Sequence, residues 1–490
     1  MTASPTRRLV PAARRLTRLV ARDRLPLALL GAAFVAAFLM YLPALHSGFF
    51  ADDYVYLDSV RNLSFAHYLC VSLVPASEND RLMMARDFWR PLYFLSFEAS
   101  VRLFGRHTEW YHLVNVAIHL ANVALVCLVA VRLGASRLGA AFGAAVFAVH
   151  PAAIGAVAWI SSVNSAGFTF ALAAMLAFVA AVRASGRRAA GPHALCLGLF
   201  VTGLLFRETV VSILGLAAAW YVLVEARARL GRRQTWLQLA PLAATTLIYY
   251  LVRTKGMTAP LSNPYFGARY GSHVWSHGWW YIKLGALPHA LLEAGWAVAV
   301  QRLAGVALLG VALLAAVFRR WLLMACFLGF LVSLAPIAAI QLTTDARYFY
   351  FPGALLGITT AALATEFGRI ERLPAQARDG LLAVVTVGVL IVGAGYGATR
   401  VQQWVDDFPA VHQSWIDQLR AENPSIAPGA TVYAGNTPGY LAIFGGVNLG
   451  PTVAEYYPGV RAVVLFDPAD PKQKPQTKPG DVVFIYRGGR

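Results

Sequence analysis

The sequence has little charge. Of its 490 residues only 13% are Asp, Glu, Lys or Arg, whereas 58% are hydrophobic, and the mean hydropathy is +0.56. A soluble globular domain carries roughly 25% charged residues, so this composition excludes an ordinary soluble protein and indicates a polytopic membrane protein. The formal net charge of +18 is then expected to flank membrane spans, and it does not indicate a nucleic-acid partner.

Cysteine and the common catalytic motifs are also scarce. Of the four cysteines, Cys127, Cys196 and Cys326 lie in apolar runs and Cys70 lies outside them, so the sequence predicts neither a disulfide framework nor a C-x-x-C metal site. A Walker loop, a Rossmann fingerprint, G-x-S-x-G and H-E-x-x-H are all absent. Nucleotide hydrolysis and serine or zinc hydrolase chemistry therefore lose their best markers.

Long apolar runs, by contrast, are abundant. The first, at residues 25–45, follows a basic tail at 1–24; it is longer than the apolar core of a signal peptide and ends without a small-x-small cleavage site, so we expect an uncleaved span. Further runs lie at 111–131, 138–158, 164–182, 193–206, 209–224, 236–252, 303–318, 321–341, 347–366 and 380–398. The expected fold class is an all-α polytopic membrane protein with about 11 transmembrane helices.

Arginines gather on one side of these predicted spans. They are Arg132, Arg137, Arg183, Arg187, Arg188, those in 227–233, Arg319, Arg320 and those in 369–378. The positive-inside rule makes that side cytoplasmic, so the tail 1–24 is predicted inside, and the long loop 46–110 and the C-terminus outside. A tryptophan-rich stretch within 254–302 is expected to form an interfacial or re-entrant hairpin.

The composition becomes polar, with many Pro and Gly, after residue 399. The segments "GATVYAGN", "VRAVVLFD" and "GDVVFIYRGG" are apolar, β-branched runs bounded by turn residues, a pattern typical of strands. The sequence therefore divides into the tail, a transmembrane domain at 25–399 and a small extracytoplasmic α/β domain at 400–490.

Two adjacent aspartates stand where the first span ends, in "LHSGFFADDYVYLDSVRN". Asp52 and Asp53 repel each other, and their aromatic neighbours reduce their hydration, so the arrangement costs free energy unless a cation or a reaction meets it. A solvated loop start is the alternative reading. A carboxylate whose pKa is raised in this way is a better general base than a free one.

Other polar residues are expected at the same side. His112, with Asn115, His119 and Asn122, occupies one face of the second span; that face either hydrogen-bonds to other helices or reaches a site. Arg90 either grips a phosphate or meets lipid headgroups. Arg207 with Glu208, and Asp345 with Arg347, are each simple ion pairs or part of a site.

An ordered set of segments carries a resemblance to a known family. "FFADD", "WRPLYFLS", "YHLVNVAIHLAN", "FAVHPAAIGAVAWISS", "FRET" and "DARYFYFP" together resemble the GT-C superfamily of membrane glycosyltransferases, and most nearly the protein O-mannosyltransferase-like members that carry TPR repeats. This chain has no TPR array. It also has Gly155, Val163 and Ser165 where relatives often read H-P-x-x-x-E and S-G-R-x-D.

The resemblance implies inverting transfer of a sugar from a polyprenyl-phosphate carrier to an acceptor hydroxyl on a protein, lipid or glycan outside the membrane. By matching motif, Asp52 is implied as the base, Asp53 as its partner or a possible metal ligand, and His150, Arg90 and Arg347 as site-lining residues, with a divalent cation (Mg or Mn) an open option. A bacterial inner membrane is the expected location. A lipid-linked glycan polymerase or ligase, and a lipid or solute transporter, are the alternatives.

Overall fold

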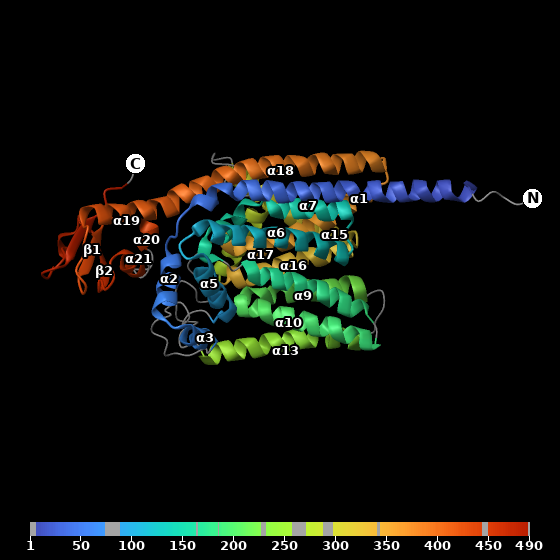
Figure 1. Cartoon of the computed structure of the whole chain (residues 1–490). Helices are drawn as coiled ribbons and strands as arrows, with labels where there is room; N and C mark the ends of the chain where they lie inside the picture. The colour runs from blue at the N-terminus through green and yellow to red at the C-terminus, as the bar shows by residue number, and fades with distance from the viewer. Residues whose placement is uncertain are drawn as a thin grey trace, which may run out of the picture.

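The computed structural model describes residues 6–73, 89–162, 165–184, 186–226, 232–256, 271–287, 297–340, 344–442 and 449–488. Helices dominate, and the long ones lie side by side in a bundle (Figure 1). The bundle helices are α1 (Thr6–Tyr41), α6 (Thr108–Leu133), α7 (Arg137–Ala148), α8 (Ile154–Ala158), α9 (Ser165–Arg183), α10 (Ala190–Phe206), α11 (Ile213–Trp220), α13 (Arg232–Gly256), α14 (His273–Ala286), α15 (Ala297–Val317), α16 (Trp321–Ala338), α17 (Tyr350–Phe367) and α18 (Ala375–Val405).

The helices confirm an integral membrane architecture. In the described part of the chain, eight are long and apolar enough to cross a membrane, and α7 with the segment Pro151–Ala158 forms a ninth candidate bent by 53°. Two predicted spans are not among these candidates: 193–206 is the shorter apolar helix Ala190–Phe206, and 236–252 falls in α13. Both are nevertheless helical, as predicted.

The helices α7 and α17 meet at a close seam. Gly143 and Gly357 face each other there, and a Cβ added at Gly357 would lie 2.8 Å from the carbonyl oxygen of Gly143. A Cβ added at Gly139 would meet the carbonyl oxygen of Ala361 at 2.7 Å. Small residues let membrane helices approach this closely and gain dispersion contacts, so the α7–α17 seam holds two helices in a fixed relation.

One end of the bundle carries the segment that follows α1. Helices α2 (Asp52–Asn62), α3 (Phe65–Leu73) and α5 (Pro91–Phe104) lie together there (Figure 1), and we call it the α2 end. Helix α5 begins directly after Arg90: Pro91 occupies the first helical position, which tolerates a missing N–H. Tyr93, Phe94 and Phe97 of α5 are buried against Tyr56 of α2.

Helix α18 leaves the bundle beside α1 and continues, past residue 399, into the C-terminal domain at the α2 end (Figure 1). The α/β prediction is confirmed, because the three expected segments form strands β1 (Thr431–Gly435), β2 (Ala462–Phe466) and β3 (Val482–Ile485). They make a parallel sheet in the order β2-β1-β3. Helices α19 (Val411–Glu422), α20 (Gly439–Ala442) and α21 (Leu449–Tyr456) complete the domain, with Trp415 and Phe484 in its core.

Candidate functional site

The aspartate pair begins helix α2 through a sharp turn. The Asp53 N–H donates to the Phe50 carbonyl oxygen at 3.1 Å, and Ala51 between them has φ 49° and ψ −117°. This is the geometry of a type II′ turn, whose first central position favours glycine. An alanine there is strained, and such strain persists only when the surroundings fix the backbone.

Asp53 points into the protein and is fully buried. Its Oδ1 accepts the Ser161 N–H at 2.8 Å, and its Oδ2 accepts the Phe50 N–H at 3.0 Å. Burial raises the pKa of Asp53 to about 7, an effect that these two hydrogen bonds oppose. With both oxygens engaged by the backbone, Asp53 joins the start of α2 to the 3-10 segment Ile160–Ser162.

Asp52 has a different environment, because adjacent residues of a helix point about 100° apart. It is half-buried, and its carboxylate lies within electrostatic range of Arg347, Tyr56 and Tyr93. The two carboxylates therefore differ in environment: Asp53 accepts backbone hydrogen bonds, and the half-buried Asp52 lies among aromatic rings near a cation.

Arg347 stands in the 3-10 turn Ala346–Phe349 that leads into α17. Its Nε lies 2.7 Å from Asp345 Oδ2, and its guanidinium lies 4.5 Å from the Trp159 ring centroid. A Cβ added at Gly155 would lie 3.3 Å from the Arg347 Cβ. Gly155 is therefore next to Arg347, and the carboxylate that pairs with this arginine belongs to Asp345.

Arg90 and Glu208, predicted separately as site residues, pair with each other. Arg90 Nε and Nη2 donate to Glu208 Oε2 and Oε1 at 2.9 and 2.6 Å, and Arg253 Nη1 lies 3.5 Å from Glu208 Oε2. A bidentate pair of this kind is strong and geometrically fixed. We call Arg90, Glu208 and Arg253 the closed cluster, because Glu208 engages both arginines.

No hydrogen bond or ion pair joins Arg207 to its neighbour Glu208 among the described residues. Arg207 has extended backbone angles, φ −161° and ψ 130°, so the two adjacent side chains point to opposite sides. The Arg207 guanidinium lies 5.8 Å from the Phe168 ring and 5.5 Å from the Tyr348 ring. The residue is 7% exposed, and within the described residues its Nε has no hydrogen-bond partner.

Arg207 and Arg347 share the Tyr348 ring, since the Arg347 guanidinium is also 5.5 Å from its centroid. Arg207, Arg347 and Asp52 form what we call the open cluster. The sequence offered Arg207 only together with Glu208, whereas the structure places it beside Arg347. A buried guanidinium with an unsatisfied donor is suited to binding an anion.

The polar face of α6 is buried, as predicted, and it hydrogen-bonds to other segments of the bundle. His112 Nε2 lies 3.0 Å from Ser47 Oγ, and Asn115 Nδ2 donates to the Trp159 carbonyl oxygen. His119 Nδ1 and Asn122 Nδ2 both reach the Tyr350 hydroxyl. These contacts tie α6 to the segments that carry Trp159 and Arg347. His112 itself contacts Ser47, in the segment that leads to the aspartate turn.

His150 caps the 3-10 turn Pro151–Ala153: its Nδ1 accepts the Ala152 N–H at 3.2 Å, and its ring lies 5.5 Å from Phe349. It therefore supports the turn that precedes Gly155. For a metal, Asp53 fits poorly because both its oxygens already accept backbone hydrogen bonds. In the described part of the chain no three His, Cys, Asp or Glu residues gather as a metal site.

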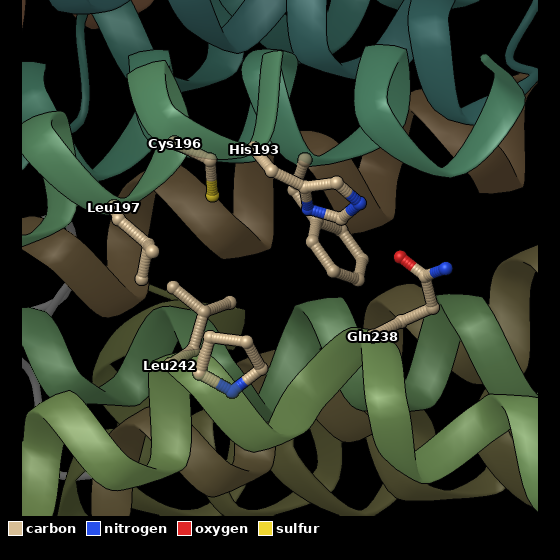
Figure 2. Close-up of a pocket in the computed structure, with 7 residues that line it drawn as sticks. His193, Cys196, Leu197, Gln238 and Leu242 are labelled. Atoms are coloured by element: carbon tan, nitrogen blue, oxygen red, sulfur yellow. The ribbon is translucent and has the colours of Figure 1, made fainter. Parts of the chain in front are cut away.

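A separate cavity of about 150 Å³ lies between α10 and α13 (Figure 2). Figure 2 shows His193, Cys196 and Leu197 from one side facing Gln238 and Leu242 from the other. His193 is near the start of α10, whereas Arg207 and Glu208 follow its last residue. This cavity is therefore distinct from the charged site at the α2 end.

The fold and site define a polytopic membrane protein with an acidic pair and several arginines gathered at one end of its helical bundle. Its sequence relatives confirm the resemblance to O-mannosyltransferase-like proteins. The chain is 34% identical over 180 residues to protein O-mannosyl-transferase Tmtc1 of Drosophila melanogaster, covering 36% of this chain and 21% of that protein. Tmtc2 of the same organism is 33% identical over 142 residues, covering 28% and 15%.

TMTC1 of Mus musculus is 30% identical over 162 residues, covering 28% of this chain and 17% of that protein. The chain thus spans about a fifth or less of the length of the curated relatives it matches. No family model matches the chain.

Among solved structures, ArnT from Cupriavidus metallidurans is similar in two states. The apo structure has a TM-score of 0.48 and 15% identity, covering 83% of this chain and 82% of ArnT. The structure bound to undecaprenyl phosphate has a TM-score of 0.49 and 13% identity, covering 89% and 85%.

Proposed function

We propose that this chain is an inverting glycosyltransferase that moves a sugar from a polyprenyl-phosphate carrier to an acceptor hydroxyl. The observation that carries the proposal is the open cluster: a half-buried carboxylate, Asp52, within electrostatic range of Arg347, with Arg207 beside the same aromatic ring. The sequence similarity to O-mannosyl-transferases supports sugar transfer as the reaction class.

The proposed step needs a base at the acceptor and cations at the leaving group. Asp52 takes the proton of the acceptor hydroxyl as its oxygen attacks the anomeric carbon, the bond from that carbon to the phosphate oxygen breaks, and the lipid phosphate leaves with the electron pair. The configuration at the anomeric carbon inverts. Arg207 and Arg347 stabilise the charge that grows on the phosphate, and the Asp53 hydrogen bonds keep Asp52 in place.

The test uses purified protein in lipid nanodiscs with three donors: a polyprenyl-monophosphate monosaccharide, a polyprenyl-diphosphate oligosaccharide and a nucleotide sugar. The acceptor is a membrane extract of cells that lack the protein, and one arm contains a chelator. Transfer from the monophosphate donor is expected, and it should be absent in Asp52→Asn. Turnover only with the diphosphate oligosaccharide indicates the polymerase or ligase alternative, and turnover only with the nucleotide sugar contradicts the proposal.

We also propose that the α2 end faces the extracytoplasmic side of a bacterial inner membrane, because the arginine-rich segments such as 369–378 lie at the other end. Cys70 is exposed at the α2 end. Two other exposed residues are suitable for introduced cysteines: Ser425 lies in the C-terminal domain at the α2 end, and Glu371 lies between α17 and α18 at the other end of the bundle (Figure 1). A membrane-impermeant thiol reagent added to intact cells should label Cys70 and Ser425→Cys and spare Glu371→Cys. Labelling of Glu371→Cys alone reverses the orientation.

A further inference from the structure

The C-terminal domain reaches the aspartate turn through one histidine. His412, in the first turn of α19, is fully buried, and its Nδ1 accepts the Ala51 N–H at 3.0 Å. A backbone N–H can only donate, so Nδ1 is unprotonated and the ring proton is on Nε2. The contact joins residues 361 positions apart, and it acts on the strained residue that precedes Asp52.

The bond supplies what the turn lacks. In a type II′ turn the Asp53 N–H closes onto Phe50, and the N–H of the first central residue has no partner inside the turn. Ala51 is 6% exposed, so its N–H is out of reach of bulk water and would cost free energy if left unpaired. His412 therefore satisfies a backbone donor that the turn itself leaves open.

The histidine is not the residue that packing alone would select. Its Nε2 is buried and has no hydrogen-bond partner within the described residues, and burying an unsatisfied polar atom is unfavourable. The site tolerates this because Nδ1 is used, and because the ring also packs on Tyr54, 5.1 Å between centroids. A function for Nδ1 explains why a polar ring stands in this position.

The surrounding contacts keep α19 in register with the turn. Phe50 lies 5.2 Å from Trp404 and 6.2 Å from Phe408, ring to ring, at the junction between α18 and α19. Further along the domain, Glu455 forms ion pairs with Arg61 and Arg106. The domain is thus held against the α2 end at several points, and His412 is the point that touches the backbone of the aspartate turn.

We propose that His412 is a positioning residue: it fixes the Ala51 turn and so holds Asp52 where it can act on the acceptor hydroxyl. The role in catalysis rests on the proposed glycosyl transfer, whereas the hold on the turn does not. The C-terminal domain is then part of the working site, because it provides the partner for a backbone group beside the base.

Three substitutions separate this role from general packing. In His412→Asn the amide oxygen takes nearly the place of Nδ1 and accepts the Ala51 N–H. In His412→Gln the oxygen lies one bond further out, near the place of Nε2, and His412→Leu has no acceptor. We expect His412→Gln and His412→Leu to lower kcat about tenfold, which corresponds to about 1.4 kcal/mol, with KM for the donor changed less than about twofold. His412→Asn is expected to remain within about threefold of the wild type.

The same His412 substitutions in an Ala51→Gly protein test the role of backbone strain at Ala51. Ala51→Gly removes the penalty of positive φ, so the turn depends less on His412, and the loss caused by His412→Leu is expected to shrink from about tenfold to about threefold. Equal losses in both backgrounds overturn the proposal, because independent residues give additive effects. Equal losses in His412→Asn and His412→Gln also overturn it, and this pair decides the matter if His412→Leu does not accumulate.

Hydrogen exchange gives a readout that is independent of sugar transfer. In the full-length protein in nanodiscs, a peptide covering residues 49–57 should exchange faster in His412→Gln and His412→Leu than in the wild type, and at the wild-type rate in His412→Asn. If the wild type transfers no sugar from any polyprenyl-phosphate donor, the proposed function fails while this comparison still decides the hold on the turn. Unchanged exchange in all three variants contradicts the proposal.

Discussion

Two groups of arginines at the α2 end look alike in sequence and differ in what their charges do. In the closed cluster, Glu208 binds Arg90 through two hydrogen bonds and also faces Arg253. In the open cluster, Arg207 has an unsatisfied buried Nε, and Arg347 pairs with an Asp345 that is one-third exposed. The closed cluster is suited to holding helices together, and the open cluster has the capacity to bind an anion.

The largest expected effect is at the carboxylate of the open cluster. Asp52→Asn keeps size and polarity but removes the base, and general bases contribute about 10²- to 10⁴-fold to rate, so transfer should fall by that factor while the protein accumulates normally. The measurement is kcat in nanodiscs beside a thermal melt of the same sample. Full transfer by a folded Asp52→Asn protein contradicts the assignment of Asp52.

Substitutions in the closed cluster should lower the stability of the folded protein. Glu208→Gln removes the counterion of Arg90, whose side chain is 13% exposed; breaking a fully buried pair costs about 3–5 kcal/mol, so this partly buried pair should cost about 3 kcal/mol. The matched change Asp345→Asn removes a more exposed partner and should cost about 1 kcal/mol or less. Thermal unfolding of both variants in the same detergent measures the difference, and equal shifts in Tm would remove the distinction between the two clusters.

Substitutions in the open cluster should lower transfer because they weaken binding of the donor phosphate. Arg207→Ala and Arg347→Ala each remove a charge-assisted contact to the phosphate, and we expect transfer to fall by about 10- to 100-fold, since such bonds contribute about 1.5–3 kcal/mol. Lysine should restore only part of the activity because it lacks the planar fork.

Arg369→Ala, an exposed arginine at the opposite end of the bundle paired with Glu366, is the control and should behave as the wild type. A loss in that variant as large as in Arg207→Ala would mean that the assay responds to charge in general.

The smallest expected effect is a pH dependence set by Asp53. Its pKa is raised to about 7 by burial, so below about pH 7 it is protonated, one oxygen becomes a donor, and one of the two backbone N–H groups loses its acceptor. Transfer should therefore rise severalfold as the pH increases through about 7. The rise is expected to be absent from the kcat profile of Asp53→Asn, which cannot ionise; a rise that persists in this variant belongs to another group.

Much of the helical architecture follows from the sequence, because the length of an apolar run indicates whether it can cross a membrane. The three strands of the C-terminal domain were equally predictable from their turn residues. The pairing of Arg90 with Glu208 was not, since they are 118 residues apart. Sequence adjacency favoured Arg207 as the partner of Glu208, and the extended backbone at Arg207 prevents that.

The aspartate pair shows both the reach and the limit of the sequence. Its position after the first span predicts a functional site. The resemblance to O-mannosyltransferases implies Asp52 as the base and Asp53 as its partner. The different tasks of Asp52 and Asp53 depend on which direction each side chain takes from α2. The contact of His412 with Ala51 depends on how a separate domain docks, and no local pattern encodes it.

The glycine seam between α7 and α17 provides a fixed reference for measuring distances within the molecule. The turn that bears Arg347 runs into α17, and the segment that bears Trp159 and Ser161 follows α7, so both are attached to helices whose backbones already touch. Spectroscopic labels on α7 and α17 should keep one separation throughout turnover. A changing distance from those two labels to a label on α2 then reports movement of the aspartate turn. A changing distance to a label on α19 reports movement of the C-terminal domain.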